Sequence, residues 1–320
     1  MIIKEIKYNE TAEHLNRTNL ISVSEEHIDF CRNYWGAEPV CLGFFNNNNV
    51  LSAVLVLLRW QENGLIYLGA SLKSYTEIIF LKDIDIDFKK IIDFIKKNFA
   101  FDILDLSICP IINNNQYLPK SNWFTATYIL KTNNSASPDD LLRAMDGKTR
   151  NQIKKSQEYN LNKENCQDVE KFYPIYCDTI ERLGARPKSR KYFGDLKNYF
   201  GRNFYIIFAE KDRQAIGANL FVIKGNYLAL LFNASKKDFW RYNINDFLYW
   251  ETIRFGLSQG VAFFDFGLNA KRDKKQIHFK AGFGARAFPI YHSVTLNSLR
   301  AFFTIYKNKL IFLSKLLIKK

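Results

Sequence analysis

The stretch INDFLYWETIRFGLSQGVAFFDFGL, residues 244–268, is the strongest indication of the fold, because a similar stretch occurs earlier in the chain. The earlier one is DIDIDFKKIIDFIKKNFAFDILDL, residues 83–106. Each begins with apolar residues at helical spacing and ends in a short apolar run that is typical of a buried strand. The two endings, FDILDL and FFDFGL, also resemble each other. A helix followed by a strand is therefore predicted twice.

Three predicted strands precede each of these stretches, separated by turn residues such as NNNN and ENG. In the first half they are residues 40–45, 50–60 and 65–70. In the second half they are residues 203–210, 215–223 and 227–235. One more predicted strand follows each stretch, at 123–130 and 287–294. A repeated order of this kind predicts two similar units in one chain.

The expected fold class is α/β, of the α+β kind, with two lobes of mixed and mostly antiparallel sheet joined by a helix. We expect an N-terminal lobe at 1–135 and a C-terminal lobe at 136–297. The second lobe would include the connecting helix, residues 137–160. A basic amphipathic helix would follow at 298–320.

The composition limits the environment and the partners of the chain. The 46 Lys and Arg exceed the 32 Asp and Glu, which gives a net charge of +14 and favours polyanionic partners. Part of this excess reflects base-composition bias, because the chain is rich in Asn and Ile as well as in Lys. The 5 Cys are odd in number and form no CxxC pair, so we expect a reducing compartment and no metal site. No segment reads as a signal peptide or a membrane span, and we expect a cytoplasmic protein.

The connecting segment contains GKTRNQIKKSQEYN, residues 147–160, with cations on both flanks of an apolar stripe. On one continuous helix the stripe would consist of Leu142, Met145, Thr149 and Ile153. Arg150 and Lys154 share one flank. Because the helix joins the lobes, we expect these two side chains to face the inter-lobe cleft and bind an anionic part of donor or acceptor. Plain solvation of a basic helix face is the alternative.

At this point the residues resemble a known family. The pattern is KTRNQIKKS (148–156), RLGARPKSRKYF (182–193), a long stretch from NASKK to FFDFG (233–267), and HFKAGFGA (278–285). It is similar to the FemAB-type branch of the GNAT superfamily, best over about residues 123–292. That branch has two GNAT-like lobes in one chain. It includes aminoacyl-tRNA-dependent peptidyltransferases of cell-wall cross-bridges and shorter acetyltransferase-like relatives found with polysaccharide synthesis.

Two departures from that family bear on the acyl donor. The chain has no room for the long coiled-coil arm of some cross-bridge enzymes. The glycine-rich pyrophosphate loop of ordinary GNAT enzymes is replaced by KKDFWRYNIN, residues 236–245. Without glycines the backbone cannot approach a pyrophosphate closely, so side chains would hold the phosphate instead. The donor- or substrate-binding candidates in this loop are Lys236, Trp240, Arg241, Tyr242 and Asn245. For Asn245, a helix N-cap is the alternative.

Acyl transfer to an amine requires a deprotonated amine, a polarised carbonyl and alignment of the two. The catalytic candidates are Asp265 and Lys280. Asp265, at the end of a buried strand, would orient the amine or take its proton; capping of a nearby loop is the alternative. Lys280 matches the family's Phe-Lys motif, which implies contact with a phosphate or the oxyanion; a surface lysine is the alternative. No nucleophile–histidine spacing points to covalent catalysis.

The first lobe offers weaker candidates for the acceptor side. Arg59, Trp60 and Tyr75 would line it, because an exposed Trp beside Arg is a common ligand surface. Packing of Trp60 in the core is equally consistent with the sequence.

The resemblance therefore implies an N-acyltransferase that moves an acetyl, acyl or aminoacyl group to an amine of a cell-envelope glycan or peptidoglycan precursor. Acyl-CoA or aminoacyl-tRNA would serve as co-substrate, with no tightly bound cofactor. The acceptor would be phosphorylated, or linked to a nucleotide or lipid. The alternative is a non-catalytic RNA- or membrane-surface-binding protein on a transferase-like fold. The sequence leaves the donor, the acceptor and the oligomeric state open.

The C-terminal stretch LRAFFTIYKNKLIFLSKLLIKK, residues 299–320, combines bulky apolar residues with cations. As a helix it is too interrupted by charge to span a bilayer, but it suits peripheral contact with an anionic membrane. Phe302, Phe303 and Leu310 fall on one helical side, so packing on the body is the alternative. Membrane contact would place the protein at the inner face of the membrane.

Overall fold

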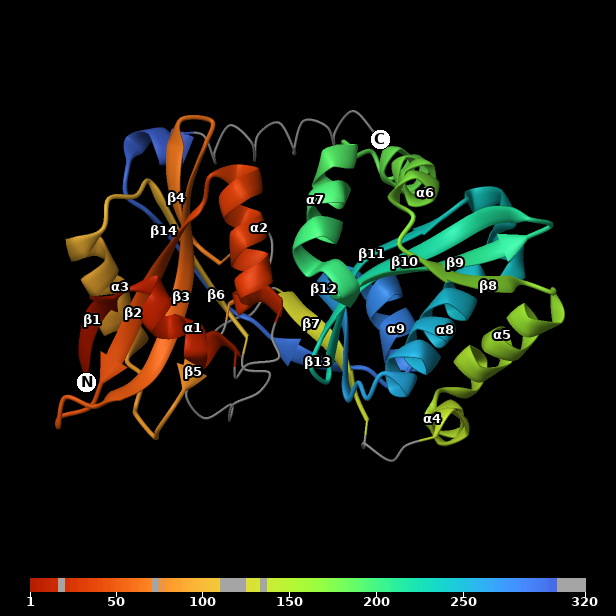
Figure 1. The fold of residues 1–320 in the computed structure, drawn as a ribbon, viewed down its shortest axis with the longest axis horizontal. Coiled ribbons are helices and arrows are strands. Elements are labelled where there is room, and N and C mark those ends of the chain that lie inside the picture. Colours follow the sequence, from red (N-terminus) through yellow and green to blue (C-terminus); the bar gives the residue numbers. More distant parts are fainter. Residues whose placement is uncertain (17–20, 71–74, 77, 110–124, 133–136, 304–320) are drawn as a thin grey trace. The chain divides into compact units, whose positions relative to one another are not determined.

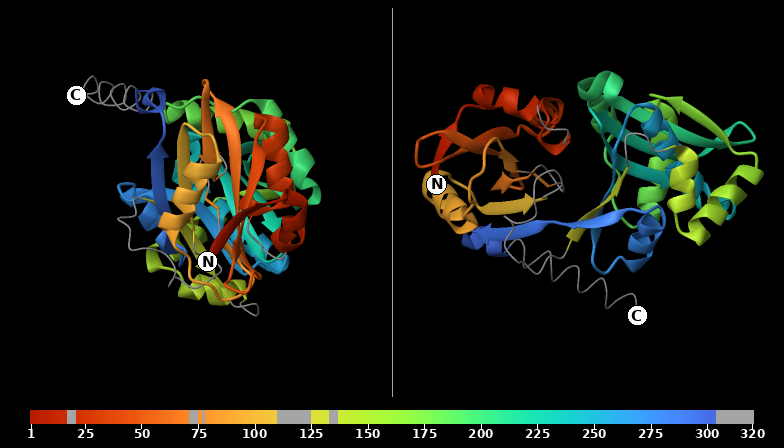
Figure 2. Two further views of the ribbon diagram at one scale, coloured as in Figure 1. Left: turned by 90° about the vertical axis from the view of Figure 1, so that its left-hand side faces the viewer. Right: turned by 90° about the horizontal axis from the view of Figure 1, so that it is seen from below.

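The computed structural model describes all residues except 17–20, 71–74, 77, 110–124, 133–136 and 304–320. The chain divides into two compact units, each built around one seven-stranded mixed sheet (Figures 1 and 2). Unit 1 consists of residues 1–18, 31–123 and 290–320. Unit 2 consists of residues 19–30 and 124–289. The predicted α+β class with two sheet-based lobes is confirmed.

In unit 1 the strand order is β1-β2-β3-β4-β6-β14, with β5 paired to β3. The strands are β1 (Ile2–Ile6), β2 (Glu38–Phe45), β3 (Leu51–Glu62), β4 (Leu65–Gly69), β5 (Ile78–Phe80), β6 (Ile103–Ile108) and β14 (Tyr291–Leu296). The helices are α1 (Tyr8–Asn16), α2 (Glu25–Trp35) and α3 (Phe88–Asn98), and the 3-10 turn η1 (Ile21–Val23) that precedes α2 is counted with unit 2. The first residues of α2 are counted with unit 2. Helix α3 buries Phe88, Ile91 and Ile95 against one face of the sheet.

In unit 2 the strand order is β13-β7-β12-β11-β10-β9-β8. The strands are β7 (Thr125–Lys131), β8 (Asn162–Cys166), β9 (Phe204–Lys211), β10 (Gln214–Lys224), β11 (Tyr227–Ser235), β12 (Phe263–Ala270) and β13 (Arg286–Pro289). The helices are α4 (Pro138–Ala144), α5 (Gly147–Glu158), α6 (Val169–Arg182), α7 (Arg190–Phe200), α8 (Ile244–Ser258) and α9 (Lys274–Gly282). Two 3-10 segments, η3 (Gly201–Asn203) and η4 (Lys237–Tyr242), complete the unit.

Helices cover both faces of the sheet of unit 2 (Figure 1). On one face, α6 and α7 bring Tyr176 and Phe193 against Phe232 of β11, with ring centroids 5.4 and 5.2 Å apart. On the other face lies α8, whose Thr252 hydroxyl accepts a hydrogen bond from Asn219 of β10. Helix α8 is buried on most sides, which is why its sequence is apolar nearly all round.

The outermost predicted strands do not pair within the lobes that chain order suggests. Residues 123–130 were expected in the first lobe, but β7 pairs with β12 and β13 in unit 2. Residues 287–294 were expected as one strand, but they are divided between β13 in unit 2 and β14, which pairs with β6 in unit 1. Backbone pairing of strands is set by neighbours that are distant in the chain, which a local pattern cannot indicate.

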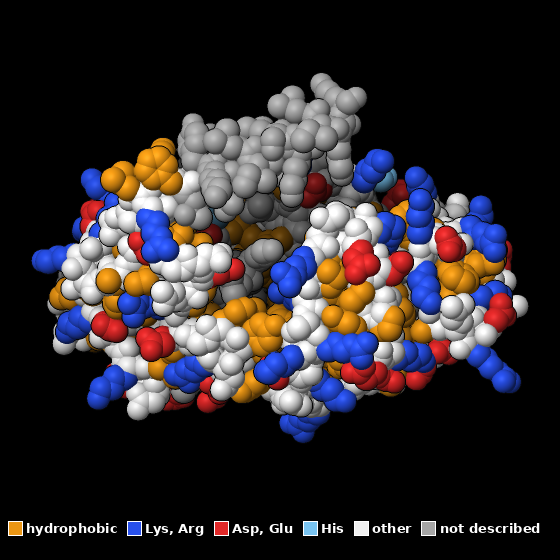
Figure 3. All heavy atoms as spheres, turned by 90° about the horizontal axis from the view of Figure 1, so that it is seen from above, with side chains coloured by type: hydrophobic (Ala, Val, Ile, Leu, Met, Phe, Trp, Pro, Cys, Tyr) orange, Lys and Arg blue, Asp and Glu red, His pale blue; other side chains and the backbone are white. Residues whose placement is uncertain are grey.

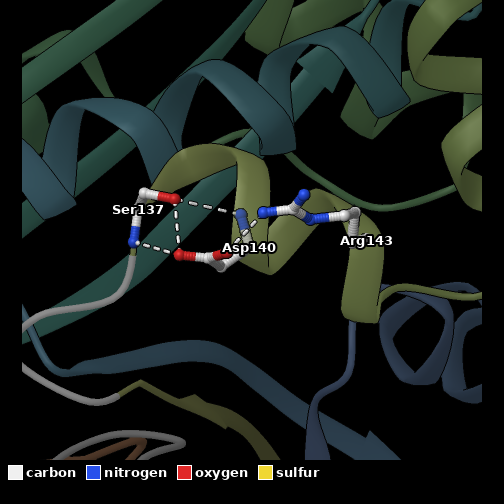
Figure 4. A network of polar contacts seen from close by, with 3 residues as sticks. All are labelled: Ser137, Asp140 and Arg143. Atoms are coloured by element: carbon white, nitrogen blue, oxygen red, sulfur yellow. Dashed lines mark hydrogen bonds and ion pairs between the residues drawn. The ribbon is translucent and has the colours of Figure 1, made fainter.

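The single helix predicted at 137–160 is two helices, α4 and α5. Ser137 and Asp140 form a reciprocal capping box at the start of α4, and Arg143 is 2.6 Å from Asp140 (Figure 4). The chain leaves α4 at Met145, and the carboxylate of Asp146 then accepts from the backbone N–H of Lys148 to start α5. A capping Asp followed by Gly favours a new helix start over continuation.

None of the described helices is both long and apolar enough to cross a bilayer. Most of the predicted C-terminal helix lies outside the described residues. Only its first turn, residues 299–303, is helical within them, and Phe302 and Phe303 are exposed there.

Candidate functional site

Strands β11 and β12 of unit 2 run parallel but separate after three residue pairs. Pairing extends from Tyr227 opposite Phe263 to Ala229 opposite Asp265. Beyond that point β12 is irregular between Asp265 and Leu268, and Gly267 has a φ of +82°. A residue with a side chain is strained at such a φ, so the glycine permits this bulge. The separation leaves backbone of both strands next to a cavity.

The cavity has a volume of about 690 Å³ and lies entirely within unit 2. Its walls come from β11, η4, the first turns of α8, the β12 bulge and α9. The apolar and aromatic lining residues are Leu230, Leu231, Trp240, Tyr249, Phe266, Leu268 and Phe279. The polar ones are Asn233, Asn245, Lys275, Gln276 and Lys280, together with the backbone at Gly267. An apolar pocket with a few polar groups is the usual form of a small-molecule site.

Lys280 is the only lysine among the buried polar residues of the described chain, with 4% of its surface exposed. It lies in the last turn of α9, and its Nζ donates a hydrogen bond to the backbone oxygen of Gly267 at 2.9 Å. Burial lowers the pKa of Lys280 to about 8, against the opposing effect of the Asp265 and Asp273 charges. The ammonium is thus held at the bulge, at the edge of the cavity, by a single backbone contact.

Asp265 is also buried, with 5% exposure, and three groups donate to its carboxylate. They are the hydroxyl of Thr127, the hydroxyl of Tyr227 at 2.8 Å and the backbone N–H of Gly267 at 2.8 Å. Asp265 does not line the cavity itself; it fixes Gly267, which does. In this arrangement the carboxylate positions the bulge and supplies negative charge near Lys280.

Trp240 and Asn245, which the sequence placed in one loop, and Lys280, which it placed elsewhere, all line the cavity. Asn245 does not cap α8: the N-cap residue is Asn243, which adopts a left-handed conformation and provides no side-chain cap. The amide oxygen of Asn245 is buried and has no hydrogen-bond partner. Lys236, Arg241 and Tyr242 occupy the same loop, where Arg241 donates to the hydroxyl of Tyr242 at 2.9 Å.

The start of α8 carries a buried carboxyl group. Asp246 lies in the first turn with 7% exposure, and its Oδ1 has no hydrogen-bond partner. Burial raises the pKa of Asp246 to about 6, against its own backbone N–H and the charge of Lys148. The carboxylate of Asp246 therefore occupies the positive end of the helix dipole. A bound pyrophosphate would otherwise be stabilised most at that position.

The predicted cations of α5 have different surroundings. The guanidinium of Arg150 donates to the backbone oxygens of Arg143 at 2.9 Å and Met145 at 2.7 Å. It thereby satisfies carbonyls at the end of α4. Lys154 is exposed. Neither lines the cavity of unit 2.

The candidates in the first lobe belong to unit 1. Trp60 is 8% exposed and stacks on Tyr67 with centroids 5.2 Å apart, so it packs as a core residue. Tyr75 is buried as well. Arg59 is partly exposed and lies 3.9 Å from Glu38.

Several cavity residues were not identified from the sequence. Tyr249 and Phe279 read as ordinary core aromatics, and Asn233 and Gln276 as ordinary polar residues. Asn233 donates to Asn219, which donates to Thr252, so a buried polar chain holds it. Tyr249 lies four residues after Asn245 on the same helix face, which is the one signal that relates it to the loop.

Comparison with known proteins gives the same picture of the fold. Residues 123–216 match the FemAB family. No curated protein matches the sequence. The crystal structure of FemX aligns with a TM-score of 0.65 and 12% identity, covering 90% of this chain and 95% of FemX.

Two further solved structures align over nearly their whole length. The C-terminal domain of a putative lysylphosphatidylglycerol synthetase from Agrobacterium fabrum has a TM-score of 0.56 and 11% identity, with 94% and 95% coverage. A tandem GNAT protein from the clavulanic acid biosynthesis pathway has a TM-score of 0.55 and 9% identity, with 93% and 99% coverage.

At these identities the alignments establish the fold and leave the substrates open. The resemblance noted in the sequence is confirmed. The chain carries a FemAB family domain match at residues 123–216 and has the tandem GNAT-like fold of FemAB-type acyltransferases.

Proposed function

We propose that this protein is an N-acyltransferase whose reaction centre is the cavity between β11 and β12. It transfers an acetyl, acyl or aminoacyl group from acyl-CoA or aminoacyl-tRNA to an amine of a cell-envelope glycan or peptidoglycan precursor. The observation that carries the proposal is Lys280, a buried ammonium at the edge of a cavity of about 690 Å³. Buried, unpaired lysines are rare without a functional role.

In the proposed reaction the amine nitrogen attacks the acyl carbonyl carbon. The bond from that carbon to the carrier's ester oxygen or thioester sulfur breaks, and its electron pair leaves with that oxygen or sulfur. The proton lost by the attacking amine is transferred to this leaving group, directly or through water. Negative charge develops on the carbonyl oxygen in the transition state. Nζ of Lys280 uses one hydrogen for the oxygen of Gly267, which leaves two for the developing oxyanion.

Asp265 acts in this scheme as a positioning residue. Its carboxylate already accepts three hydrogen bonds and is turned to Thr127, Tyr227 and Gly267. It holds the bulge that carries the Lys280 contact, and its charge favours the ammonium form of that lysine.

The donor is left as one of two classes. The loop η4 in place of a glycine-rich turn, and Asp246 in the first turn of α8, both disfavour a pyrophosphate seated at the helix end. They favour a donor whose phosphates are held by side chains such as Lys236 and Arg241. This is compatible with a charged tRNA and with an acyl-CoA bound differently from ordinary GNAT enzymes.

The candidate partners remain those that the sequence indicated. The acceptor is a phosphorylated, nucleotide-linked or lipid-linked glycan precursor, and residues 299–320 would bring the protein to an anionic membrane surface. Arg150, Lys154, Arg59 and Tyr75 stay candidates for acceptor contacts, although their described surroundings give no direct support. Over the described residues drawn in Figure 3, basic side chains are interspersed with acidic and hydrophobic ones.

The test measures acyl transfer by mass spectrometry, with acetyl-CoA or charged tRNA as donor and a nucleotide-linked muramyl peptide as acceptor. Replacing Lys280 by Met should lower the transfer rate by about 10²–10³-fold, as loss of an oxyanion donor does in other enzymes. Lys274→Met is the matched control because Lys274 lies on the same helix, is exposed and does not line the cavity. A Lys280→Met protein that folds and retains full activity would exclude this role.

A binding measurement separates the two donors and the non-catalytic alternative. A ligand present at about 100 times its dissociation constant should stabilise the protein by about 2.7 kcal/mol. A thermal shift with acetyl-CoA or with charged tRNA identifies the donor class. If neither donor produces a thermal shift while uncharged RNA or anionic vesicles still bind, the result supports the non-catalytic binding protein instead.

A further inference from the structure

Trp240 is a large aromatic side chain held in one orientation at the cavity while remaining 43% exposed. Its Nε1 donates to the hydroxyl of Ser235 at 3.0 Å. The guanidinium of Arg182 lies over the indole, 4.5 Å from the ring centroid. Arg182 is itself fixed, because it donates to the backbone oxygen of Ser235 at 3.1 Å. The indole is therefore preorganised by contacts to α6 and to the end of β11.

This arrangement is unusual for a tryptophan that serves only the core. Its polar nitrogen is already satisfied within the protein, so exposure of the ring is not needed to hydrate it. Exposed apolar ring surface at a cavity marks a ligand contact more often than a packing residue. A fixed flat ring loses little conformational entropy when a second flat ring stacks on it.

The charges around the ring favour a phosphorylated ligand. Lys236, Lys237 and Arg241 belong to the same loop, and Lys275 lines the cavity. None of these four forms an ion pair with an acidic residue in the described part of the chain, although Asp238 lies within the loop. A stacking surface with neighbouring cations is the general arrangement by which proteins hold a nucleotide without reading its sequence.

We propose that Trp240 stacks the adenine ring of the acyl donor while the cations of η4 contact its phosphates. The assignment rests on the proposed acyl transfer, because it places the coenzyme A or tRNA part of the acyl donor on the Trp240 side of the cavity. Both donor classes contain the required group: coenzyme A carries an adenosine diphosphate, and a charged tRNA ends in an adenosine. The shared chemistry is thus a phosphorylated adenosine, and the two sources are separated by experiment.

The experiment compares two matched probe pairs by calorimetric or anisotropy titration of the full chain at fixed salt. One pair is coenzyme A and 4′-phosphopantetheine, which lacks the adenosine. The other is a hairpin RNA ending in CCA and the same hairpin ending in CC, which lacks the terminal adenosine. In one of the two pairs, the probe that contains the adenosine should bind about tenfold more tightly than the probe that lacks it. This is the size of effect expected for one stacked base. Trp240→Ala should abolish that preference, and Trp240→Phe should retain part of it.

Two controls distinguish stacking from general disturbance. Trp35→Phe changes a partly buried tryptophan of unit 1 and should leave the preference unchanged. Arg182→Met removes the guanidinium from the indole and should weaken the preference without abolishing it. Equal binding within both pairs, or a preference that survives Trp240→Ala, would overturn the proposal.

The outcome is separable from that of the proposed function. Acyl transfer that depends on Lys280, with no adenosine preference, would overturn the Trp240 assignment and leave the transferase standing. Absence of binding to both coenzyme A and the CCA hairpin would overturn the assignment and also weigh against the transferase.

Discussion

The two units carry an aspartate at the same register of a parallel strand pair, and the two aspartates have different surroundings. In unit 1, β4 and β6 pair from Tyr67 to Gly69, which ends opposite Asp105. In unit 2, β11 and β12 pair for the same three positions and end opposite Asp265. The strand order around both pairs is also alike.

Asp105 has a side chain that is 41% exposed, and its neighbours are the hydroxyl of Ser107 at 2.8 Å and Nδ1 of His292 at 3.3 Å. Asp265 is buried and saturated with three donors, and a buried lysine lies beside it. The strand arrangement, which both units share, is therefore not sufficient to form a functional site. In unit 2 both Asp265 and Lys280 are buried, whereas Asp105 of unit 1 is partly exposed.

The largest expected difference is in stability. Asp265→Ala should lower the free energy of unfolding by about 3–5 kcal/mol, because it leaves three buried donors unpaired and removes the anion near Lys280. Asp105→Ala should cost only about 1 kcal/mol, since Asp105 is partly exposed and Ser107 keeps its hydrogen bond with His292. Urea unfolding followed by circular dichroism measures both. Similar losses for the two variants would show that the units are energetically alike at this position.

The next effect is the pH dependence that Lys280 confers. Its folded-state pKa of about 8 lies below the ordinary value of 10.5, so between these pH values the unfolded chain binds more protons. Stability of the wild type relative to Lys280→Met should therefore rise with pH from about 8 to 10.5, by up to about 3 kcal/mol. Unfolding at several pH values measures this difference, which cancels the titration of other groups. A flat difference would indicate that Lys280 is hydrated in the folded protein.

The smallest expected effect concerns the residues opposite the two aspartates. A Cβ at Gly69 would lie 2.3 Å from the backbone oxygen of Asp105, whereas unit 2 already has Ala229 at this place. Gly69→Ala should cost about 2 kcal/mol because backbone must move, while Ala229→Gly should cost about 0.5–1 kcal/mol through chain entropy. Thermal melts of both variants test this. A neutral Gly69→Ala would mean that β4 and β6 separate as easily as β11 and β12.

Much of the fold could be predicted because the local patterns agree with the final structure. The apolar runs that became β3, β10 and β11 bury most of their residues, and α3 has a narrow apolar face. Three residues that the sequence singled out, Trp240, Asn245 and Lys280, line one cavity, and their functional roles stay predictions. Helices α6 and α7 were not assigned, although RLGARPKSRKYF was quoted for its resemblance to the family.

The amino-acid sequence alone indicates the repeated order of strands and helices, the excess of basic charge and the family resemblance. These depend on residues close together in the chain. Tertiary structure decided that β7 pairs in unit 2 and β14 in unit 1, and that Thr127 donates to Asp265 from 138 positions away. It also decided that Lys280 is buried. Lysine is usually exposed, and only the packing of α9 against the β12 bulge removes this one from water, which lowers its pKa and makes it the principal candidate for catalysis.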